Sequence, residues 1–349
     1  EALHQKLLNL DAKHAASGTY PYYYFEDVWD EGYLGTRDPI PINTNPALVF
    51  ESKAGEHDQV AVSAAFLNGF GKWAVKLRSG QMASDGTADM SQYYYQVGTG
   101  RVPKLGRDIA VSDHKSRHAV VIHRDRFFKI DLFTADGQHA TVPALEQALR
   151  QVLVSEAPAS QIGRLTTMER DAWAVNREKL ESASPNNANI LKAIDTALMV
   201  LVLEDAEPTS VSDGLPLWLM GVESRWYDKH QLIVSKNGLA GINLEHAFGD
   251  GMTWLRWMGE VWTAVQGNPA ALPAVKETSE VPTVQALQWD IPPAVAQAAV
   301  EADKAFRAAV KNNDVKALVV DIITRDEMKR RQMPPDSTAQ VAFQFAHQR

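Results

Sequence analysis

The residues of this chain with the clearest capacity for proton transfer lie between Glu245 and Gly251, in the segment Glu-His-Ala-Phe-Gly-Asp-Gly. The ordinary pKa of a histidine, about 6.5, lies near working pH, so His246 can take a proton from a substrate hydroxyl. Glu245 and Asp250 place carboxylates on either side of it. The pattern therefore predicts a general base, and the alternative is a hydrogen-bonded core histidine at the end of a strand.

The neighbouring segments predict the elements that position His246. Gln231 to Val234 and Leu239 to Leu244 are apolar runs separated by Lys-Asn-Gly. An Asn-Gly pair favours a hairpin turn in which both central residues have φ > 0. Met252 to Val265 has apolar side chains at helical spacing, so a helix is expected to begin after Gly249-Asp250-Gly251. The positive dipole at its N-terminus favours negative charge beside the histidine.

A second candidate site is the densest cationic run of the chain, Arg325-Asp326-Glu327-Met328-Lys329-Arg330-Arg331. Spaced arginine and lysine side chains can bind phosphates through charge-assisted hydrogen bonds, and a solvated basic turn is the alternative. The spacing of His114, His118 and His123 matches no known ligand pattern, and the last two would point to opposite faces of a strand. We therefore predict no metal site.

Composition restricts the classes of function. The chain has 349 residues, of which 45% are hydrophobic, and this length suggests about two domains. A formal net charge of -8 argues against a nucleic-acid or anionic membrane surface as partner. The absence of cysteine excludes disulfides, thiolate metal sites and a cysteine nucleophile. No apolar run approaches the roughly 18 residues that a membrane span needs, so we expect no integral membrane protein.

The apolar periodicity changes repeatedly between helical and strand spacing, which predicts an α/β fold. Thr166 and Glu169 predict a capping box at the start of a helix, and the Pro- and Ala-rich residues 268–283 predict a linker between domains. Further helices are expected over His57–Leu77, Pro143–Val154, Pro292–Asn312 and Pro335–His347, and further strands over His118–Ile122, Arg126–Leu132, Ala197–Leu203, Gln285–Ile291 and Ala317–Ile323.

An ordered set of sequence blocks resembles the carnitine/choline acyltransferase family, most closely its members of the inner mitochondrial membrane. The resemblance spans essentially the whole chain and roughly the first half of the family pattern. It implies a CoA-dependent acyltransferase fold, in which two related α/β domains with mixed sheets and flanking helices meet at a tunnel. The blocks are Tyr33-Leu34 with Arg37-Asp38-Pro39, Asp89-Met90-Ser91-Gln92-Tyr93, Arg101-Val102-Pro103, Leu165-Thr166 with Glu169-Arg170-Asp171, Arg225-Trp226-Tyr227-Asp228-Lys229, Glu245-His246 with Asp250-Gly251, and Pro335-Asp336 with Gln340.

The resemblance also implies that the chain is divided into three structural regions. We expect residues 1–55 to form an N-terminal helix and a connecting segment that packs on the second domain, residues 56–284 to form the domain with the catalytic histidine, and residues 285–349 to begin an incomplete second domain. The family's oxyanion donor and carnitine-carboxylate residues would follow Arg349. Since losing one oxyanion donor costs on the order of 10² to 10³ in kcat, this chain alone is expected to be an incomplete catalyst, and the other half could be a separate chain.

The activity implied by the resemblance is transfer of a fatty acyl group between CoA and carnitine, and we expect a long-chain acyl group. His246 would be the general base and Asp250 would orient the site, with direct transfer and no acyl-enzyme. Arg325 and Lys329 match the family's CoA-phosphate pair, although arginine stands where lysine is usual and Thr324 where glycine is usual.

The expected partners follow from the same resemblance. They are acyl-CoA and carnitine, with coenzyme A as a substrate rather than a cofactor, no nucleic acid and at most peripheral membrane contact. A mitochondrial location is expected, with the peroxisome as the alternative. The competing functions are a non-catalytic CoA-binding fragment, and a family member with another acyl length or with another acceptor such as choline.

Overall fold

The computed structural model describes residues 2–18, 23–52, 55–56, 58–84, 89–318, 320–321 and 323–348. Contacts between residues divide the chain into two units, Glu1–Asp314 and Val315–Arg349. Each unit is described by itself. In the described part of the chain, no helix has both the length and the apolar character that crossing a membrane requires.

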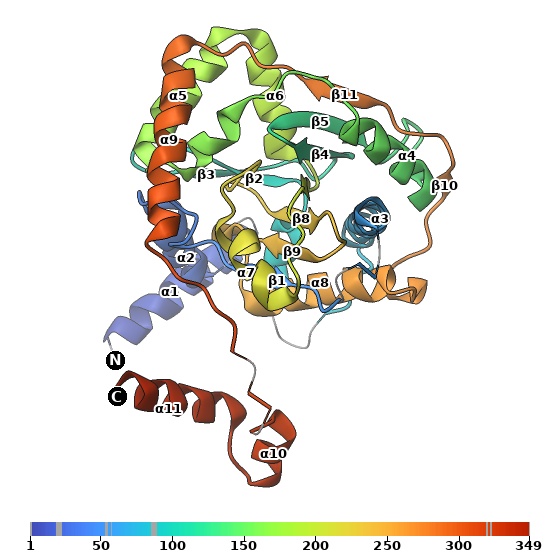
Figure 1. Ribbon diagram of the computed structural model, residues 1–349. Helices are drawn as coiled ribbons and strands as arrows, with labels where there is room; N and C mark the ends of the chain where they lie inside the picture. The colour runs from blue at the N-terminus through green and yellow to red at the C-terminus, as the bar shows by residue number, and fades with distance from the viewer. Residues whose placement is uncertain are drawn as a thin grey trace. The chain divides into compact units, whose positions relative to one another are not determined.

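A mixed seven-stranded sheet lies at the centre of the first unit (Figure 1). Its strand order is β1-β9-β8-β7-β4-β5-β11, in which β7 is parallel to both β4 and β8 and the other neighbours are antiparallel. The α/β fold class is thereby confirmed. The strands are β1 Ala47–Val49, β4 His118–His123, β5 Arg126–Asp131, β7 Val200–Glu204, β8 Gln231–Ser235, β9 Ala240–Asn243 and β11 Val284–Leu287.

Helices cover both faces of the sheet because its central strands are apolar on both sides. In β4, Val121 belongs to one hydrophobic cluster and Val120 to the other. The first cluster includes α3, α4 and α8, and the second includes α5, α6 and α9 (Figure 1). These helices are α3 Gln59–Arg78, α4 Val142–Leu153, α5 Arg170–Ala183, α6 Pro185–Thr196, α8 Gly251–Val265 and α9 Pro293–Lys311. His57, where a helix was expected to begin, lies outside the described residues.

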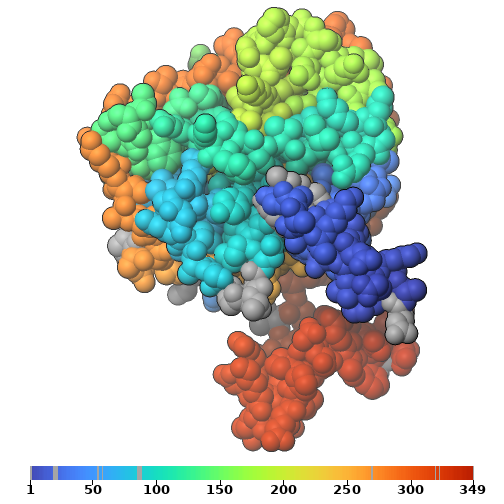
Figure 2. All heavy atoms as spheres, turned by 180° about the vertical axis from the view of Figure 1, so that it is seen from behind, coloured from blue at the N-terminus to red at the C-terminus, as the bar shows by residue number. Residues whose placement is uncertain are grey.

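The remaining elements of the first unit are short or lie at its surface. In Figure 2 the N-terminal segment, in dark blue, lies against the cyan and teal surface that includes residues near 90 to 112. The elements are α1 Ala2–Ser17, α2 Tyr24–Leu34, η1 Ser91–Tyr95, β2 Thr99–Val102, β3 Ile109–Ser112, β6 His139–Ala140, η2 Gln161–Thr167, α7 Val211–Met220, η3 His246–Phe248, η4 Pro269–Ala271 and β10 Glu277–Thr278.

The hairpin that leads to His246 is confirmed, but its turn differs from the prediction. Gly238 has a φ of 83°, whereas Asn237 is not among the positive-φ residues. The three-residue loop is closed by hydrogen bonds from Gly238 N to Ser235 O (2.9 Å) and from Ser235 N to Leu239 O (2.8 Å). This is the geometry of a longer hairpin loop with a left-handed glycine. The turn with two positive φ values instead joins β4 to β5, at Arg124 and Asp125.

The predicted capping box at Thr166 is wrong. Helix α5 begins at Arg170 with Glu169 as its N-cap, and the Glu169 carboxylate accepts from the backbone N–H groups of residues 171 and 172. Thr166 lies in η2, where its hydroxyl donates to Gly163 O (2.7 Å) and accepts from Tyr227 N (3.1 Å). The threonine therefore connects two segments of the core instead of starting a helix.

Residues 268–283, which were expected to link two domains, lie within the first unit. Strand β10 pairs with β6, and β11 completes the large sheet by pairing with β5. Helix α9 then packs on η2 and α5. The contacts divide the chain after Asp314, and the assignment of residues 285–349 to a second domain stays a prediction.

The described residues of the second unit form two helices, α10 Arg325–Arg330 and α11 Pro335–His347. The predicted final helix is thereby confirmed. A strand was expected over residues 317–323, but the described residues of this range form none, and Val319 and Ile322 lie outside them. The cationic run, for which a solvated basic turn was the alternative interpretation, is largely helical.

Candidate active site

His246 lies in η3, immediately after the hairpin, and aromatic rings surround its imidazole. The ring of Tyr33, from α2, stacks on it with a centroid distance of 4.4 Å and an interplanar angle of 9°. Trp254 approaches edge-on at 5.0 Å, and Trp29 lies at 5.7 Å. The Tyr33 hydroxyl is 3.4 Å from Nε2 of His246. The histidine is therefore enclosed on several sides while Nε2 lies beside a polar group.

Burial lowers the pKa of His246 below its ordinary value, and the residue's own backbone carbonyl and the charge of Asp250 oppose this shift. The ring is therefore mainly neutral at pH 7. Its Nδ1 is buried and has no hydrogen-bond partner of normal geometry among the described residues. A neutral imidazole with the proton on Nδ1 would leave the Nε2 lone pair available as a proton acceptor.

Asp250 is the N-cap of α8, as the position of the predicted helix implies. Its carboxylate accepts from the backbone N–H of Gly251 at 2.7 Å, and its own N–H donates to the Gln92 side chain at 3.1 Å. The side chain is exposed. The structure therefore brings Asp250 close enough to His246 to act on its charge, but no hydrogen bond joins the two side chains in the described residues.

Glu245, next to the histidine, is completely buried and fixes the backbone of η3. One carboxylate oxygen accepts from Nη1 of Arg101 at 2.8 Å, and the other accepts from the backbone N–H of Ala247 at 2.9 Å. Burial raises the pKa of Glu245, although Arg101 opposes that shift. The backbone N–H of Glu245 donates to Nδ1 of His230 at 3.1 Å. Glu245 is thus a structural carboxylate held by a buried cation.

His230 is the buried core histidine of this region. Its Nδ1 accepts from Glu245, so Nε2 carries the proton and faces Oε1 of Gln96 at 3.2 Å. Burial holds the pKa of His230 well below its usual range. The Gln96 amide also contacts Gly249, where a Cβ atom would lie 2.8 Å from Nε2 of the glutamine. Gly249 is therefore needed for close packing behind the histidine.

A chain of buried ion pairs runs from Glu245 into the core. Asp108 accepts from Nε of Arg101 at 2.6 Å and from Nε of Arg170 at 2.7 Å, and Arg170 donates through Nη1 to Asp228 at 2.7 Å. All of these side chains are fully buried. Burial acts to raise the pKa of Asp108, but the two arginines outweigh it and hold the pKa below its ordinary value. The Arg37 side chain also donates to Asp108, at 2.9 Å. Five sequence blocks far apart in the chain therefore meet around Asp108, which lies outside all of them.

Sequence reasoning did not single out Asp108 or the aromatic ring of Trp29. An aspartate in the segment Leu-Gly-Arg-Asp has no local sign of burial. Trp29 lies four residues before Tyr33 in α2, which places both rings on one face of that helix. That spacing was the available signal.

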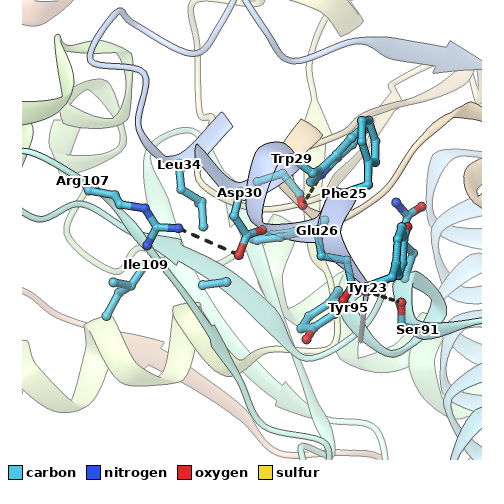
Figure 3. Close-up of a pocket in the computed structure, with 14 residues that line it drawn as sticks. Tyr23, Phe25, Glu26, Trp29, Asp30, Leu34, Ser91, Tyr95, Arg107 and Ile109 are labelled. Atoms are coloured by element: carbon cyan, nitrogen blue, oxygen red, sulfur yellow. Dashed lines mark hydrogen bonds and ion pairs between the residues drawn. The ribbon is translucent and has the colours of Figure 1, made fainter. Parts of the chain in front are cut away.

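A cavity of about 270 Å³ lies beside the histidine loop (Figure 3). Its walls come from α2 and the preceding Tyr23, from η1, from β3 and the nearby Arg107, and from residues 247 and 248. Nε1 of Trp29 donates to Ala247 O at 3.0 Å. Arg107 faces Asp30 (Figure 3), and their charged groups are 3.9 Å apart. Neither His246 nor Tyr33 lines this cavity. It is therefore a neighbouring space rather than the place where Nε2 would meet a hydroxyl.

Two of the three histidines considered as metal ligands have hydrogen-bond partners in the backbone. His118 Nε2 is 2.7 Å from Ala193 O, and His123 Nδ1 is 3.0 Å from Leu203 O. Among the residues that the structure describes, no group of three or more His, Asp or Glu side chains is arranged to hold a metal ion.

Arg325 and Lys329 lie four positions apart on α10, so they share one face of this helix. Both side chains are exposed. The neighbouring Arg330 donates to Glu327 at 2.6 Å. The structure describes this pair within the second unit by itself, so its relation to His246 stays a prediction.

A neutral, half-enclosed histidine that follows a strand of a mixed α/β fold can accept a proton from a bound group. The family model described as choline/carnitine O-acyltransferase matches residues 1–349. The chain belongs to this family, as the sequence blocks indicated.

Several curated relatives carry names within this family. The human protein "Carnitine O-palmitoyltransferase 2, mitochondrial" is 27% identical, over 99% of this chain and 58% of its own length. The protein of the same name from Xenopus tropicalis is 30% identical over 74% of this chain and 40% of its own length. Choline O-acetyltransferase from Drosophila melanogaster is 26% identical over 99% of this chain and 53% of its own length. The chain thus spans about half the length of the curated relatives it matches.

Proposed function

We propose that the protein transfers a long-chain acyl group between CoA and carnitine, with His246 as the general base. Family membership supports acyl transfer. The names of the carnitine O-palmitoyltransferase relatives support carnitine and a long acyl chain. The observation that carries the proposal is the protonation state and exposure of His246. Its ring is mainly neutral. Its Nε2 lies 3.4 Å from the Tyr33 hydroxyl, so a polar group can approach this nitrogen.

The proposed reaction is a direct displacement at the thioester. Nε2 of His246 takes the proton of the carnitine hydroxyl as its oxygen forms a bond to the thioester carbonyl carbon. The carbon–sulfur bond then breaks, and the proton passes from the imidazolium to the leaving CoA sulfur. A correctly placed base contributes roughly 10² to 10⁴-fold to such a step.

Asp250 has an electrostatic part in this proposal. The charge of Asp250 raises the pKa of His246 against the effect of burial, so it stabilises the imidazolium that forms during transfer. As the N-cap of α8, the carboxylate is held by the backbone N–H of Gly251. We therefore assign Asp250 the role of tuning the base, with orientation coming from other residues.

Arg325 and Lys329 are proposed to contact the phosphates of CoA. Their exposed positions one helical turn apart give two cations on one face of α10. Neither cation makes an ion pair with another residue in the described part of the chain, in contrast to Arg330 and its partner Glu327. Arginine offers a fork of donors for a phosphate, whereas lysine offers a point charge.

The test of this function uses the natural full-length protein with palmitoyl-CoA and L-carnitine, with palmitoylcarnitine followed by mass spectrometry. We expect palmitoylcarnitine and free CoA in equal amounts, both dependent on carnitine. A panel of choline and shorter acyl-CoAs addresses the other family activities, which the choline O-acetyltransferase relatives favour. Intact mass after incubation with acyl-CoA alone should show no acyl adduct, as direct transfer requires.

A non-catalytic CoA-binding protein is the outcome that would replace the proposal. Calorimetric titration would then show CoA binding while no acceptor in the panel supports turnover. A mitochondrial location is likewise a proposal, supported by the printed names of the relatives. Fractionation of the source cells, with antibody detection of the protein in each compartment, tests it.

A further inference from the structure

Arg101 is the buried residue at which three parts of the candidate site meet. Its Nη1 donates to Oε1 of Glu245 at 2.8 Å, its Nη2 donates to the backbone carbonyl of Tyr33 at 2.7 Å, and its Nε donates to Oδ2 of Asp108 at 2.6 Å. The Arg101 side chain is completely buried. The guanidinium therefore touches no solvent, and each of its three nitrogen atoms has a different partner.

Two of these partners lie directly beside His246. Glu245 precedes it and caps η3 by accepting from the backbone N–H of Ala247 at 2.9 Å. Tyr33 belongs to α2, and its ring stacks on the imidazole at 4.4 Å. The stacking depends on α2 and η3 keeping their relative positions, although the two elements are far apart in the sequence. Arg101 bonds to both, and the bond from Trp29 Nε1 to Ala247 O (3.0 Å) is a second tie.

We propose that Arg101 is a positioning residue that holds His246 against Tyr33. Its planar guanidinium donates hydrogen bonds to Glu245 in the turn before His246, to the end of α2 and to the buried anion Asp108. The inference rests on the proposed role of His246 as the base. Arg101 acts through these two elements and does not touch a substrate, since its side chain is fully enclosed.

The geometry of the guanidinium distinguishes arginine from lysine here. Arginine presents donors in a fixed plane, whereas the lysine ammonium is a single point charge on a flexible chain. The variant Arg101→Lys therefore keeps the positive charge beside Asp108 and Glu245 but cannot hold three partners in different directions. It separates the loss of position from the loss of charge.

The expected result for Arg101→Lys is a fall in kcat on the order of 10²-fold, since a small misplacement of a catalytic group has an effect of this size. The KM for acyl-CoA should stay unchanged. The matched control is Arg164→Lys, because Arg164 is also buried and also has three acceptor partners, the carboxylates of Asp125, Glu223 and Asp303. The control should keep the wild-type kcat, as Arg164 has no contact with the histidine loop.

A double-mutant cycle with Tyr33→Leu tests whether Arg101 acts through the stacked ring. If Arg101 works by holding Tyr33 and His246 together, Arg101→Lys should lower kcat much less in the Tyr33→Leu background than in the wild type. Equal fold-losses in the two backgrounds would contradict the proposal, because independent effects multiply in rate.

A readout without activity keeps the positioning proposal separate from the proposed function. In the NMR spectrum of protein with labelled histidine, the stacked Tyr33 ring shifts the His246 ring protons upfield, and the His246→Gln variant assigns the signal. This upfield shift should be lost in Arg101→Lys and kept in Arg164→Lys. If the wild-type protein catalyses no acyl transfer but the two variants still differ in this way, the proposed function is overturned and the positioning role of Arg101 stands.

The result that overturns the positioning role is an Arg101→Lys protein with unchanged His246 signals and unchanged kcat. If Arg101→Lys does not fold, Glu245→Gln replaces it, since the glutamine oxygen can still accept from Ala247 while its amide cannot accept from Arg101. The same loss of the upfield shift supports the proposal, and wild-type signals in this variant overturn it.

Discussion

The ring of Tyr33 lies parallel to that of His246, with 4.4 Å between centroids and 9° between planes. This stacking covers one face of the imidazole, so part of the burial that lowers the pKa of the histidine comes from α2. It also places the tyrosine hydroxyl 3.4 Å from Nε2. Helix α2 is therefore a wall of the candidate site.

The pH dependence of activity follows from the lowered pKa of His246. A base must be neutral to accept a proton, so kcat/KM should be at its plateau at pH 7 and fall with decreasing pH below the ordinary histidine range. The charge of Asp250 raises this pKa. In Asp250→Asn the acidic limb should therefore move to lower pH, whatever the plateau activity. The measurement is kcat/KM between about pH 5 and pH 8.

Asp213→Asn is the control for this profile, because Asp213 is an exposed carboxylate in the first turn of another helix, α7. Its acidic limb should coincide with that of the wild type. An acidic limb that stays in place or moves to higher pH in Asp250→Asn would show that Asp250 does not tune the base.

Removing the charge of Asp108 should strongly destabilise the protein. Asp108→Asn would leave the guanidinium groups of Arg101 and Arg170 buried without their shared anion. Breaking a buried ion pair in this way costs about 3 to 5 kcal/mol. The free energy of unfolding from urea titration measures the effect.

The matched control for Asp108 is Asp205→Asn. Asp205 pairs with Arg124 at 2.6 Å, but both side chains are about half exposed, and such surface pairs contribute below about 1 kcal/mol. Similar losses in the two variants would mean that burial of the ion-pair chain adds little to stability.

The local elements could be predicted because their signals are short-range. Strand β9 and helix α8 follow from the apolar spacing on either side of Gly249 and Gly251. Turn details were less predictable: Asn237-Gly238 favours a two-residue turn, but the pairing of Ser235 with Leu239 requires three loop residues. Local propensity was overridden there by the register of the strands.

The arrangement around His246 could not be read from the sequence in the same way. Glu245 and Arg101 are 144 positions apart, and a charge pattern does not say which carboxylate a distant arginine will meet. The sequence blocks identified Arg101 and Arg170 as family features, but their common partner Asp108 lies outside the blocks. Such pairing depends on how the elements pack, which one sequence does not encode locally.

Gly71 and Gly259 should respond to alanine in opposite directions. A Cβ atom at Gly71 in α3 would lie 1.9 Å from Nε2 of His139, a ring that is fully buried and cannot move aside. Such overpacking costs about 1 to 3 kcal/mol or more. A Cβ atom at Gly259 in α8 meets nothing within 4 Å, so Gly259→Ala should stabilise by about 0.5 to 1 kcal/mol. The measurement is the thermal unfolding temperature of both variants. A Gly71→Ala protein that is more stable than the wild type would contradict the close packing of Gly71 against His139.

The proposed contact of Arg325 and Lys329 with CoA predicts that removing both cations raises the KM for acyl-CoA and leaves the pKa of His246 unchanged. In Arg325→Ala/Lys329→Ala the KM for acyl-CoA should rise about tenfold or more, since a hydrogen bond to a charged group contributes about 1.5 kcal/mol or more. The control is Lys311→Ala, an exposed cation in the last turn of α9. An unchanged KM in the double variant would remove the phosphate role from α10.

The most direct test of the central claim is the kcat of His246→Ala in the natural full-length protein, compared with His114→Ala. His114 is an exposed histidine outside the site, so its variant should keep wild-type activity. We predict that His246→Ala loses at least about 10²-fold in kcat while calorimetric titration shows unchanged acyl-CoA binding. Wild-type kcat in His246→Ala would contradict the assignment of His246 as the base.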